Sequence, residues 1–446
     1  MRARRWLGNP LLVAVCLLAA GCSHAPKEGS STGGAGAPAK AATVQGPARD
    51  LIIGQSGSAI TALTSDTGSV IFREPAVPAL GDWSELYTTI RRGRHTIVRA
   101  TPLAADGQTE ADRVPGHLAV RTVSFDGTRA ALIAPLRRGL DPWRPRPRAA
   151  TTIVVANLTG NGATSRFHLE GNLDPEAFSS DDQYLFLIKY VPATAPTAYR
   201  VVALELNDGD GDVYPVAGRN KTWSPKMAGT RLQQVASPYG DMLYTLYSSQ
   251  PPRYARGYDA TQAAVGRPVA FVHTLNLQEH WAVCVPLPKQ LWGGRSVDEA
   301  MALAPSGSDL YVVDAKRNFI ASMYTTRPLA TGRPRVTRSR ALHLGLGSVG
   351  QVHAAVSPNN TSLTIARGHD IVTVDAHRLR VMGRTTVPGP VSGLGWSDDG
   401  KRLYVLTPGA VRLLDPSTGR QLRRIDSAGM HGIDYVGSLD EGSGQP

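Results

Sequence analysis

The stretch SDDGKRLYVLTPGAVRLLDPSTG, residues 397–419, contains the pattern that decides the fold. It opens with a Ser-Asp-Asp-Gly turn, continues into a strand that starts at Leu403-Tyr404, and ends in a second strand followed by Asp-Pro-Ser-Thr-Gly. Asp, Pro and Gly favour tight turns, because they fix or tolerate the backbone dihedral angles that such turns require. The stretch therefore predicts short strands joined by tight turns.

The same turn-and-strand pattern recurs through most of the chain. Short strands at regular spacing with turn signals predict an all-β fold. A period of about 40 to 50 residues with four strands per repeat is typical of a β-propeller. The copies before residue 397 begin at Gly81, Ser124, Ser179, Ser237, Ala304 and Ser357, so the intervals run from 40 to 67 residues.

The two ends of the repeat region complement each other. Residues 51–72 contain three strands without a first one, and residues 432–438 contain a first strand without successors. Joined in one composite blade, they would close the ring and leave no open edge between the first and last blades. We predict a single β-propeller over residues 50–440 with eight four-stranded blades, or seven if the weak copy at Gly81 is not a blade.

These turns and the Leu-Tyr strands after them resemble the blades of WD40-like and YVTN-type bacterial propellers over residues 50–440. Two segments, PEAFSSDDQYLFLIKY (175–190) and FVHTLNLQEHWAVCVPL (271–287), are similar to lipid-anchored propellers of unassigned function from actinobacteria. The resemblance implies a fold and brings no activity with it, because function resides in sites that a fold can carry in many versions.

The first 22 residues, MRARRWLGNPLLVAVCLLAAGC, have the organisation of a secretory signal. Basic residues precede an apolar run from Leu11 to Ala20, which is shorter than the roughly 20 residues that a spanning helix needs. The segment LAAGC, residues 18–22, resembles the lipobox of bacterial lipoproteins, although Ala19 stands where that motif usually has Leu. This resemblance implies that residues 1–21 are removed as a signal peptide and that Cys22 carries a lipid such as palmitate.

Residues 22–49 are rich in Gly, Ser, Ala and Pro and have no apolar periodicity. Such a composition predicts a flexible tether, and residues 441–446 are expected to be a disordered tail. With Cys16 removed and Cys22 acylated, Cys284 would be left without a partner for a disulfide. We expect a protein that is anchored in the cell membrane by its lipid and faces outside the cytoplasm.

The charge of the chain limits its partners. The 446 residues carry a net charge of +12, which becomes about +9 when the three signal-peptide arginines are excluded. A basic protein favours acidic partners in general. Because the expected compartment lies outside the cytoplasm, we expect no nucleic acid partner, and we expect the chain to be a monomer.

An arginine-rich loop is the candidate binding element. Residues 136–148, LRRGLDPWRPRPR, lie between two expected strands of one blade, and their prolines favour an extended, exposed backbone. Arginine forms bidentate hydrogen bonds with phosphate and carboxylate groups. The candidate anion-binding residues are Arg137, Arg138, Trp143, Arg144, Arg146 and Arg148.

Two common motifs of catalysis are missing: no Gly-x-Ser-x-Gly elbow appears in the repeat region, residues 50–440, and His-Glu-x-x-His does not occur in the sequence. His273, His280 and Cys284 could ligate zinc, and residues 207–212 resemble the start of a calcium loop, but both segments fit β-hairpins better. We therefore predict no catalytic residue, no metal site and no cofactor. The sequence favours a binding or scaffold module for a protein or a cell-envelope glycan. The alternative is a propeller enzyme of the lactonase-like or glycan-cleaving type with its site in the central funnel.

Overall fold

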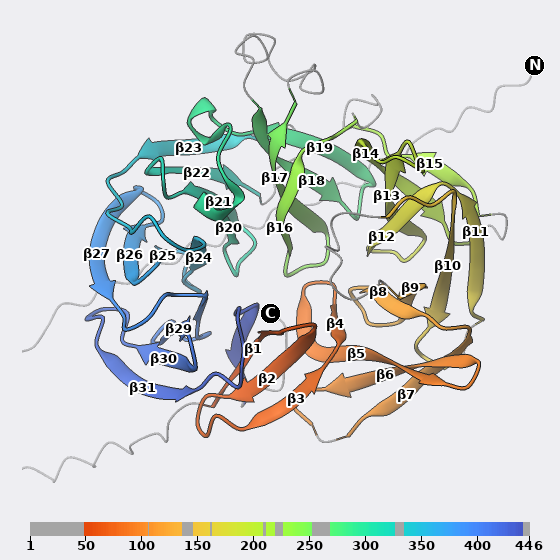
Figure 1. The fold of residues 1–446 in the computed structure, drawn as a ribbon, viewed down its shortest axis with the longest axis horizontal. Helices are drawn as coiled ribbons and strands as arrows, with labels where there is room; N and C mark the ends of the chain where they lie inside the picture. Colours follow the sequence, from red (N-terminus) through yellow and green to blue (C-terminus); the bar gives the residue numbers. More distant parts are fainter. Residues whose placement is uncertain are drawn as a thin grey trace, which may run out of the picture. The chain divides into compact units, whose positions relative to one another are not determined.

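The computed structural model describes residues 49–105, 107–135, 146–160, 163–207, 211–218, 226–251, 268–325 and 334–439. They belong to one compact unit, residues 47–446. Within these ranges the chain forms eight four-stranded antiparallel sheets arranged around a common centre (Figure 1). The predicted β-propeller with eight blades is therefore confirmed. The expected signal peptide, lipidated Cys22 and C-terminal tail, and the tether up to residue 48, lie outside the described residues.

In blades 2 to 8 the innermost strand comes first in the chain, and the second, third and fourth strands follow outwards. Blade 1 consists of β32 (Tyr435–Ser438), β1 (Asp50–Ser56), β2 (Ala59–Thr64) and β3 (Val70–Glu74), and it is the one exception to chain order. Blade 2 consists of β4 (Ala76–Ala79), β5 (Asp82–Arg92), β6 (His95–Pro102) and β7 (Thr109–Pro115). Blade 3 consists of β8 (Ala119–Val123), β9 (Arg129–Ile133), β10 (Ala150–Asn157) and β11 (Ser165–Glu170). Blade 4 consists of β12 (Asn172–Phe178), β13 (Tyr184–Val191), β14 (Ala198–Glu205) and β15 (Val213–Pro215).

The other four blades follow the same plan. Blade 5 consists of β16 (Thr230–Ala236), β17 (Met242–Gln250), β18 (Val269–Asn276) and β19 (Trp281–Pro286). Two short 3₁₀ helices, η2 (Lys289–Leu291) and η3 (Ser296–Asp298), lead into blade 6, which consists of β20 (Glu299–Leu303), β21 (Asp309–Asp314), β22 (Phe319–Tyr324) and β23 (Val336–Ala341). Blade 7 consists of β24 (His353–Val356), β25 (Ser362–Arg367), β26 (Asp370–Asp375) and β27 (Arg380–Thr386). Blade 8 consists of β28 (Gly393–Trp396), β29 (Leu403–Thr407), β30 (Ala410–Leu414) and β31 (Gln421–Asp426).

Blade 1 joins the two ends of the described chain. The last strand, β32, pairs antiparallel with β1, so that Asp50 lies opposite Ser438 and Ile53 lies opposite Tyr435. The orange and blue strands therefore share one sheet in Figure 1. The composite blade expected from the sequence is thus present, and the inner edge of β1 is covered.

The recurring Ser-x-Asp turn has a common hydrogen-bond pattern. Ser124 donates its hydroxyl to Asp126 at 2.6 Å and accepts the backbone N–H of Arg129 at 3.0 Å. Ser397 does the same with Asp399 at 2.7 Å and the N–H of Arg402 at 3.0 Å. Because the Ser and Asp side chains form their hydrogen bonds within the turn, the repeated motif specifies a tight turn independently of contacts with the rest of the fold.

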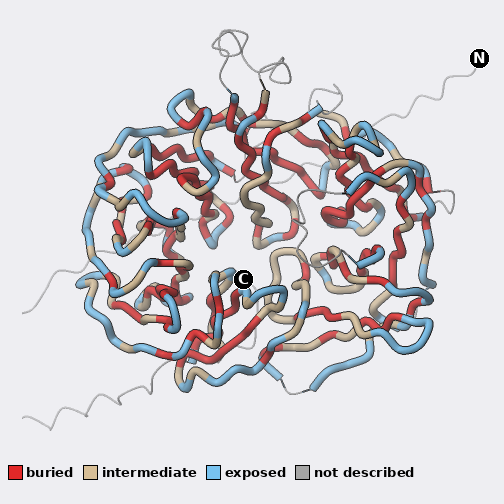
Figure 2. The backbone as a smooth tube through the Cα atoms, viewed as in Figure 1, coloured by how far each residue is buried: buried red, intermediate tan, exposed pale blue. Residues whose placement is uncertain are grey.

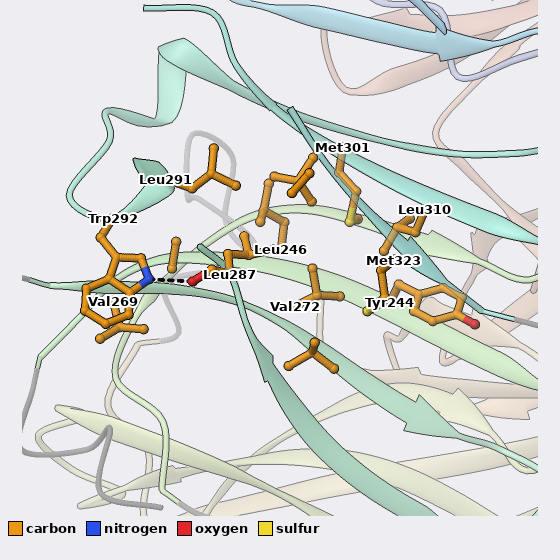
Figure 3. Packing of buried hydrophobic residues seen from close by; sticks show 14 of the residues in the cluster. Tyr244, Leu246, Val269, Val272, Leu287, Leu291, Trp292, Met301, Leu310 and Met323 are labelled. Carbon is orange, nitrogen blue, oxygen red and sulfur yellow. Dashed lines mark hydrogen bonds between the residues drawn. The ribbon is translucent and has the colours of Figure 1, made fainter. Parts of the chain in front are cut away.

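The hydrophobic core is divided into layers between blades. Eight clusters of buried apolar side chains occur among the described residues, and each contains residues of two consecutive blades. Burial is concentrated on the two middle strands of each blade, whereas the outer strands other than β19 are largely exposed (Figure 2). Between blades 5 and 6, Trp292 fills the layer and donates its indole N–H to the carbonyl of Leu287 at 2.8 Å (Figure 3). Each blade is therefore stabilised by apolar surface that its neighbours bury.

Strand order divides the connections between two faces. The antiparallel meander places every link from the second to the third strand on the face where the inner strands begin, together with every link from one blade to the next. The remaining links lie on the opposite face. There, the turns of blades 2 and 5 come together, because a Cβ added to Gly81 would lie 2.8 Å from the carbonyl oxygen of Ser237. Inner turns thus narrow the centre of the ring on the opposite face.

Candidate functional site

The face on which the inner strands begin has more basic than acidic residues in its described connections, and we call it the basic face. It is defined by the Lys and Arg residues of its described connections, which are Arg94, Arg146, Arg148, Lys226, Lys289, Arg295, Lys316 and Arg317. All except Arg148 are exposed. The same connections hold two acidic residues, Asp298 and Asp434. Asp298 is buried and forms an ion pair with Arg367.

The opposite face has the reverse balance. Its described connections carry five basic residues, Arg335, Arg378, Lys401, Arg402 and Arg420. They also carry ten acidic residues, which are Asp66, Asp126, Asp181, Asp182, Asp212, Asp241, Glu279, Asp398, Asp399 and Asp415. The acidic residues belong largely to the repeated turns, whose chemistry requires a carboxylate. The charge difference between the faces therefore follows from where the strand order places those turns.

A cluster of paired charges lies beneath the basic face, where β8 and β12 begin. Asp174 of β12 is 4% exposed and accepts hydrogen bonds from Arg121 of β8 at 3.4 Å and from Arg148 at 3.1 Å. Arg148 also donates to the side chain of Asn172 at 2.7 Å and to the carbonyl of Leu173 at 2.7 Å. These contacts link blade 3 to blade 4 at the inner end of both sheets.

Arg148 belongs to the arginine-rich loop that the sequence singled out. The structure gives its guanidinium internal partners, and Asn172 donates to the backbone carbonyl of Arg146 at 2.8 Å. The end of the loop is thus fixed to the start of β12, while the side chain of Arg146 is exposed. Arg137, Arg138, Trp143 and Arg144 lie outside the described residues. The anion-binding role of the six residues stays a prediction.

A second buried pair joins β12 to β16. Glu176 accepts hydrogen bonds from Arg231 at 2.9 Å and from Gln234 at 2.8 Å. Burial raises the pKa of Glu176, and the positive charge of Arg231 opposes that rise. The guanidinium of Arg231 also lies 6.0 Å from the centre of the Tyr247 ring, within reach of a cation–π contact. The pair connects blades 4 and 5 through buried polar contacts.

Two of the three residues that could ligate zinc, His273 and Cys284, lie opposite each other on neighbouring strands of blade 5. His273 of β18 is the register partner of Cys284 of β19, and His280 lies in the turn between these strands. Burial, and secondarily the charge of Arg231, lower the pKa of His273 to about 3, so this imidazole is neutral at ordinary pH. In the described part of the chain, no group of three or more His, Cys, Asp or Glu side chains is arranged to hold a metal ion.

A buried carboxylate of blade 6 was not anticipated from the sequence. Glu299 begins β20, is 3% exposed, and neither of its carboxylate oxygens has a hydrogen-bond partner. Burial raises its pKa to about 8, and the nearby charge of Asp314 adds to the rise. Its position resembles those of Asp174 and Glu176, because all three lie on innermost strands. A charged residue at the start of an otherwise apolar strand was the available signal for this group.

This arrangement is better suited to holding the ring together than to acid–base chemistry. Asp174 and Glu176 are both engaged by arginines, and such buried pairs hold the carboxylates fixed in place. The part of the site that a partner can reach is the set of exposed Lys and Arg side chains of the basic face. No helix in the described ranges is long and apolar enough to cross a membrane.

Comparison with known proteins does not assign the chain to a family. No family model matches the sequence, and no curated protein is similar to it. Among solved structures, apo AztD from Citrobacter koseri is 12% identical, with a TM-score of 0.49, over 87% of this chain and 97% of that one. Dihydro-haem d1 dehydrogenase NirN is also 12% identical, with a TM-score of 0.49, over 88% of this chain and 75% of that one. The periplasmic gluconolactonase PpgL from Pseudomonas aeruginosa is 16% identical, with a TM-score of 0.38, over 87% and 98%. At this distance the similarity carries no activity to this chain.

Proposed function

We propose that this protein is a lipid-anchored, extracytoplasmic β-propeller that binds an anionic cell-envelope partner, a glycan or a protein, through its basic face. The observation that carries the proposal is the difference in charge between the two faces of the ring. Seven exposed Lys and Arg residues, of which Arg317 is paired with Asp314, occupy connections of the basic face, and the acidic residues of the described connections are concentrated on the other side. A one-sided field of this kind attracts and orients a negatively charged partner.

The alternative of a propeller enzyme receives less support from the site. An enzyme of this type needs carboxylates or a metal that can reach a substrate, with pKa values suited to proton transfer. Asp174 and Glu176 are instead held by arginines in the interior, and Glu299, whose pKa is raised to about 8, is 3% exposed and out of reach of a substrate. The enzyme alternative stays a prediction. A lactonase or glycan-cleaving activity that is present in the natural chain and lost in Glu176→Gln would support it.

The anchor is tested in cells that make the full chain. Membrane and soluble fractions are compared for the natural sequence and for Cys22→Ala. The proposal expects the natural chain in the membrane fraction and the variant released from it, since one acyl-bearing residue would account for retention. Equal partition of the two chains into the membrane fraction would remove the lipid anchor from the proposal.

The basic face is tested by reversing its charge. The variant Arg94→Glu/Lys289→Glu/Lys316→Glu is compared with Lys401→Glu/Arg420→Glu/Arg378→Glu on the opposite face, which makes the same change in net charge. The probe is the isolated cell-wall fraction, used intact and after its anionic polymers have been removed. We expect retention that falls with salt and is lost in the first variant alone. Equal losses in both variants would show that net charge matters and that this face does not.

A further inference from the structure

The outermost strands of blades 7, 8 and 1 each contain a β-bulge that exposes a large apolar side chain. In β27, β31 and β3 the register with the neighbouring strand skips one residue, which is Met382, Leu422 and Ile71, respectively. These three residues are 49%, 46% and 42% exposed. Because a bulge re-aims the side chain of its extra residue, the backbone itself presents these groups at the outside of the ring.

The same bulge in other blades carries no large apolar residue. The skipped residue is Ala111 in β7 of blade 2 and Thr337 in β23 of blade 6. Val70, which precedes Ile71 on β3, is also 43% exposed, so blades 7, 8 and 1 hold four of the eight large apolar residues that are exposed in the described chain. Exposed apolar groups gathered in one place mark a surface that meets a partner or a membrane.

The three strands follow one another along the outside of the ring (Figure 1). The turn before β31 lies against β27, because a Cβ added to Gly419 would lie 2.7 Å from the Thr385 hydroxyl. Arg423 of β31 donates to the backbone carbonyl of Asp66, in the turn before β3. The exposed surface of β27, β31 and β3 is therefore continuous, and we call it the outer rim.

The outer rim is basic. Its strands carry five arginines and two acidic residues, which are Arg73, Arg380, Arg384, Arg423 and Arg424, with Glu74 and Asp426. The outermost strands of blades 2 to 5 instead carry two arginines and three acidic residues. The charge thus varies around the ring as well as between its two faces.

Most of these guanidinium groups have no carboxylate to balance their charge. Of the five, Arg380 alone forms an ion pair in the described ranges, with Asp375 at 3.7 Å. Arg73, Arg384 and Arg423 donate to backbone carbonyls of neighbouring segments. A carbonyl has no net charge, so it fixes an arginine in place and leaves the positive charge available to an anion.

The chain enters the ring next to this rim. Arg49, the residue before β1, forms an ion pair with Asp66 at 3.4 Å, and the carbonyl of Asp66 accepts the hydrogen bond from Arg423. The expected tether, residues 22–49, therefore ends beside β31. A flexible chain of this length has an end-to-end distance of about 30 Å, so a lipid on Cys22 would keep the outer rim close to the membrane.

We propose that the outer rim is a membrane-contact surface for a bilayer that contains anionic lipids. The guanidinium groups bind headgroup phosphates, and Met382, Leu422 and Ile71 enter the boundary between headgroups and acyl chains. A lipid anchor and a basic patch together give stable attachment where either alone is weak. The inference rests on the proposed function only in placing the chain at a membrane, and it concerns other residues than the basic face.

The test measures vesicle binding by the chain from residue 22 onwards with Cys22→Ala, which has no lipid and lacks the apolar run of residues 11–20. It contains the compact unit up to residue 446. Cosedimentation compares vesicles of phosphatidylcholine mixed with phosphatidylglycerol and vesicles of phosphatidylcholine alone. We expect binding to the anionic vesicles that falls with salt. No binding, or equal binding to both kinds of vesicle, would overturn the proposal.

Two variants separate the apolar and the charged parts of the rim. Met382→Ser/Leu422→Ser/Ile71→Ser should weaken binding at least about 10-fold, because less apolar surface leaves water. Arg380→Gln/Arg424→Gln should weaken it about 25-fold, or about 5-fold for each arginine.

Each variant has a matched control with circular dichroism as the check on folding. The apolar control changes three exposed residues elsewhere in the ring, as Tyr239→Ser/Tyr324→Ser/Val349→Ser. The charge control changes two exposed arginines on the outermost strands of blades 2 and 3, as Arg113→Gln/Arg166→Gln. Both controls should bind within about 2-fold of the parent chain, the parallel loss of a rim-independent charge being small. Equal losses in variants and controls would overturn a role for the rim.

A polarity-sensitive dye locates the contact. It is attached to Leu422→Cys or, on the basic face, to Val349→Cys, with Cys284→Ser in both proteins. We expect anionic vesicles to shift the dye emission to the blue at position 422 alone. A shift at position 349 alone would assign the membrane to the basic face and overturn the proposal. A dimer in light scattering that the three serine substitutions of the rim dissociate would overturn it in favour of a second copy.

The vesicle measurements need neither the lipid on Cys22 nor a cell-wall partner. Wall retention through the basic face is measured on an isolated wall fraction, and none of its substituted residues belongs to the outer rim. The failure of this inference and the failure of the proposed function are therefore distinguishable.

Discussion

Asp50, the first residue of β1, accepts hydrogen bonds at 2.8 and 3.2 Å from the guanidinium of Arg402, which lies 352 residues further along the chain. Tyr404 donates its hydroxyl to the same carboxylate. Asp50 is 2% exposed, and its side chain thus ties the composite blade to blade 8 at the point where the ring closes. Closure therefore depends on a side-chain contact as well as on the pairing of β1 with β32.

Asp50→Ala is expected to destabilise the fold by about 3–5 kcal/mol, because it leaves the guanidinium of Arg402 and the hydroxyl of Tyr404 without their shared acceptor. Urea unfolding followed by far-ultraviolet circular dichroism measures the change. Glu110→Ala is the control, since Glu110 forms an exposed ion pair with Arg113 and should cost less than about 1 kcal/mol. Equal midpoints for the two variants would contradict a role for Asp50 in closure.

Glu299→Gln is expected to stabilise the protein at alkaline pH and to have little effect at acid pH. The pKa of Glu299 is raised to about 8, so the folded state keeps a proton that the unfolded state releases near its ordinary value. This proton contributes stability below about pH 4.5, and the contribution is lost as pH rises to about 8. Thermal unfolding of both proteins across this range tests the sign. A difference that does not grow with pH would show that Glu299 is already ionised.

Gly240→Ala is expected to destabilise the protein through one contact between blades. Gly240 has a φ of +65°, and an added Cβ would lie 2.2 Å from the Phe125 ring in the turn between β8 and β9. Together the strain and the clash should cost about 2–4 kcal/mol. In the background of Phe125→Gly the clash disappears, because the Cβ of Phe125, which would lie 2.7 Å from the added Cβ, is removed as well, so Gly240→Ala should cost only about 1 kcal/mol there. Additive effects in the double-mutant cycle would exclude the contact.

Arg148→Ala is expected to lower the unfolding free energy by about 1.5–3 kcal/mol, whereas Arg146→Ala should change it by less than about 0.5 kcal/mol. The two residues lie on the same segment, but Arg148 binds Asp174 and Asn172, and the side chain of Arg146 is exposed. Differential scanning calorimetry compares them. If both variants melt like the natural chain, the contact of Arg148 with β12 contributes no stability.

Much of the fold could be read from the repeats. The Ser-x-Asp turns at Ser124 and Ser397 complete their own hydrogen bonds, so their letters predict the turn wherever it lies. Even the weak copy at Gly81 forms a complete blade, which makes eight. The strands at the two ends were recognisable as parts of one blade, because one end had three strands and the other had one.

The candidate site was less accessible to such reasoning. The arginine-rich loop was visible as a local run of one residue type, yet the internal partners of Arg148 could not be derived from it, since Asp174 belongs to the next blade. Glu299 carried no local signal beyond its charge. A groove between blades 7 and 8 is lined by residues that are far apart in the sequence, such as Thr373 and the turn at 416–419, so no local pattern indicates it.

The sequence by itself determined the unit of construction, because a turn and the alternation of a strand are local properties that neighbouring residues specify. It left the number of blades at eight or seven, and the structure decided for eight. The tertiary structure alone decided which residues share a face of the ring and which residues of different blades are in contact. Strand order placed most of the acidic turns on one side of the ring and left a surplus of basic residues in the described connections of the other. The adjacency of blades brought Arg402 to Asp50, a contact between residues of different blades that their spacing along the chain does not predict.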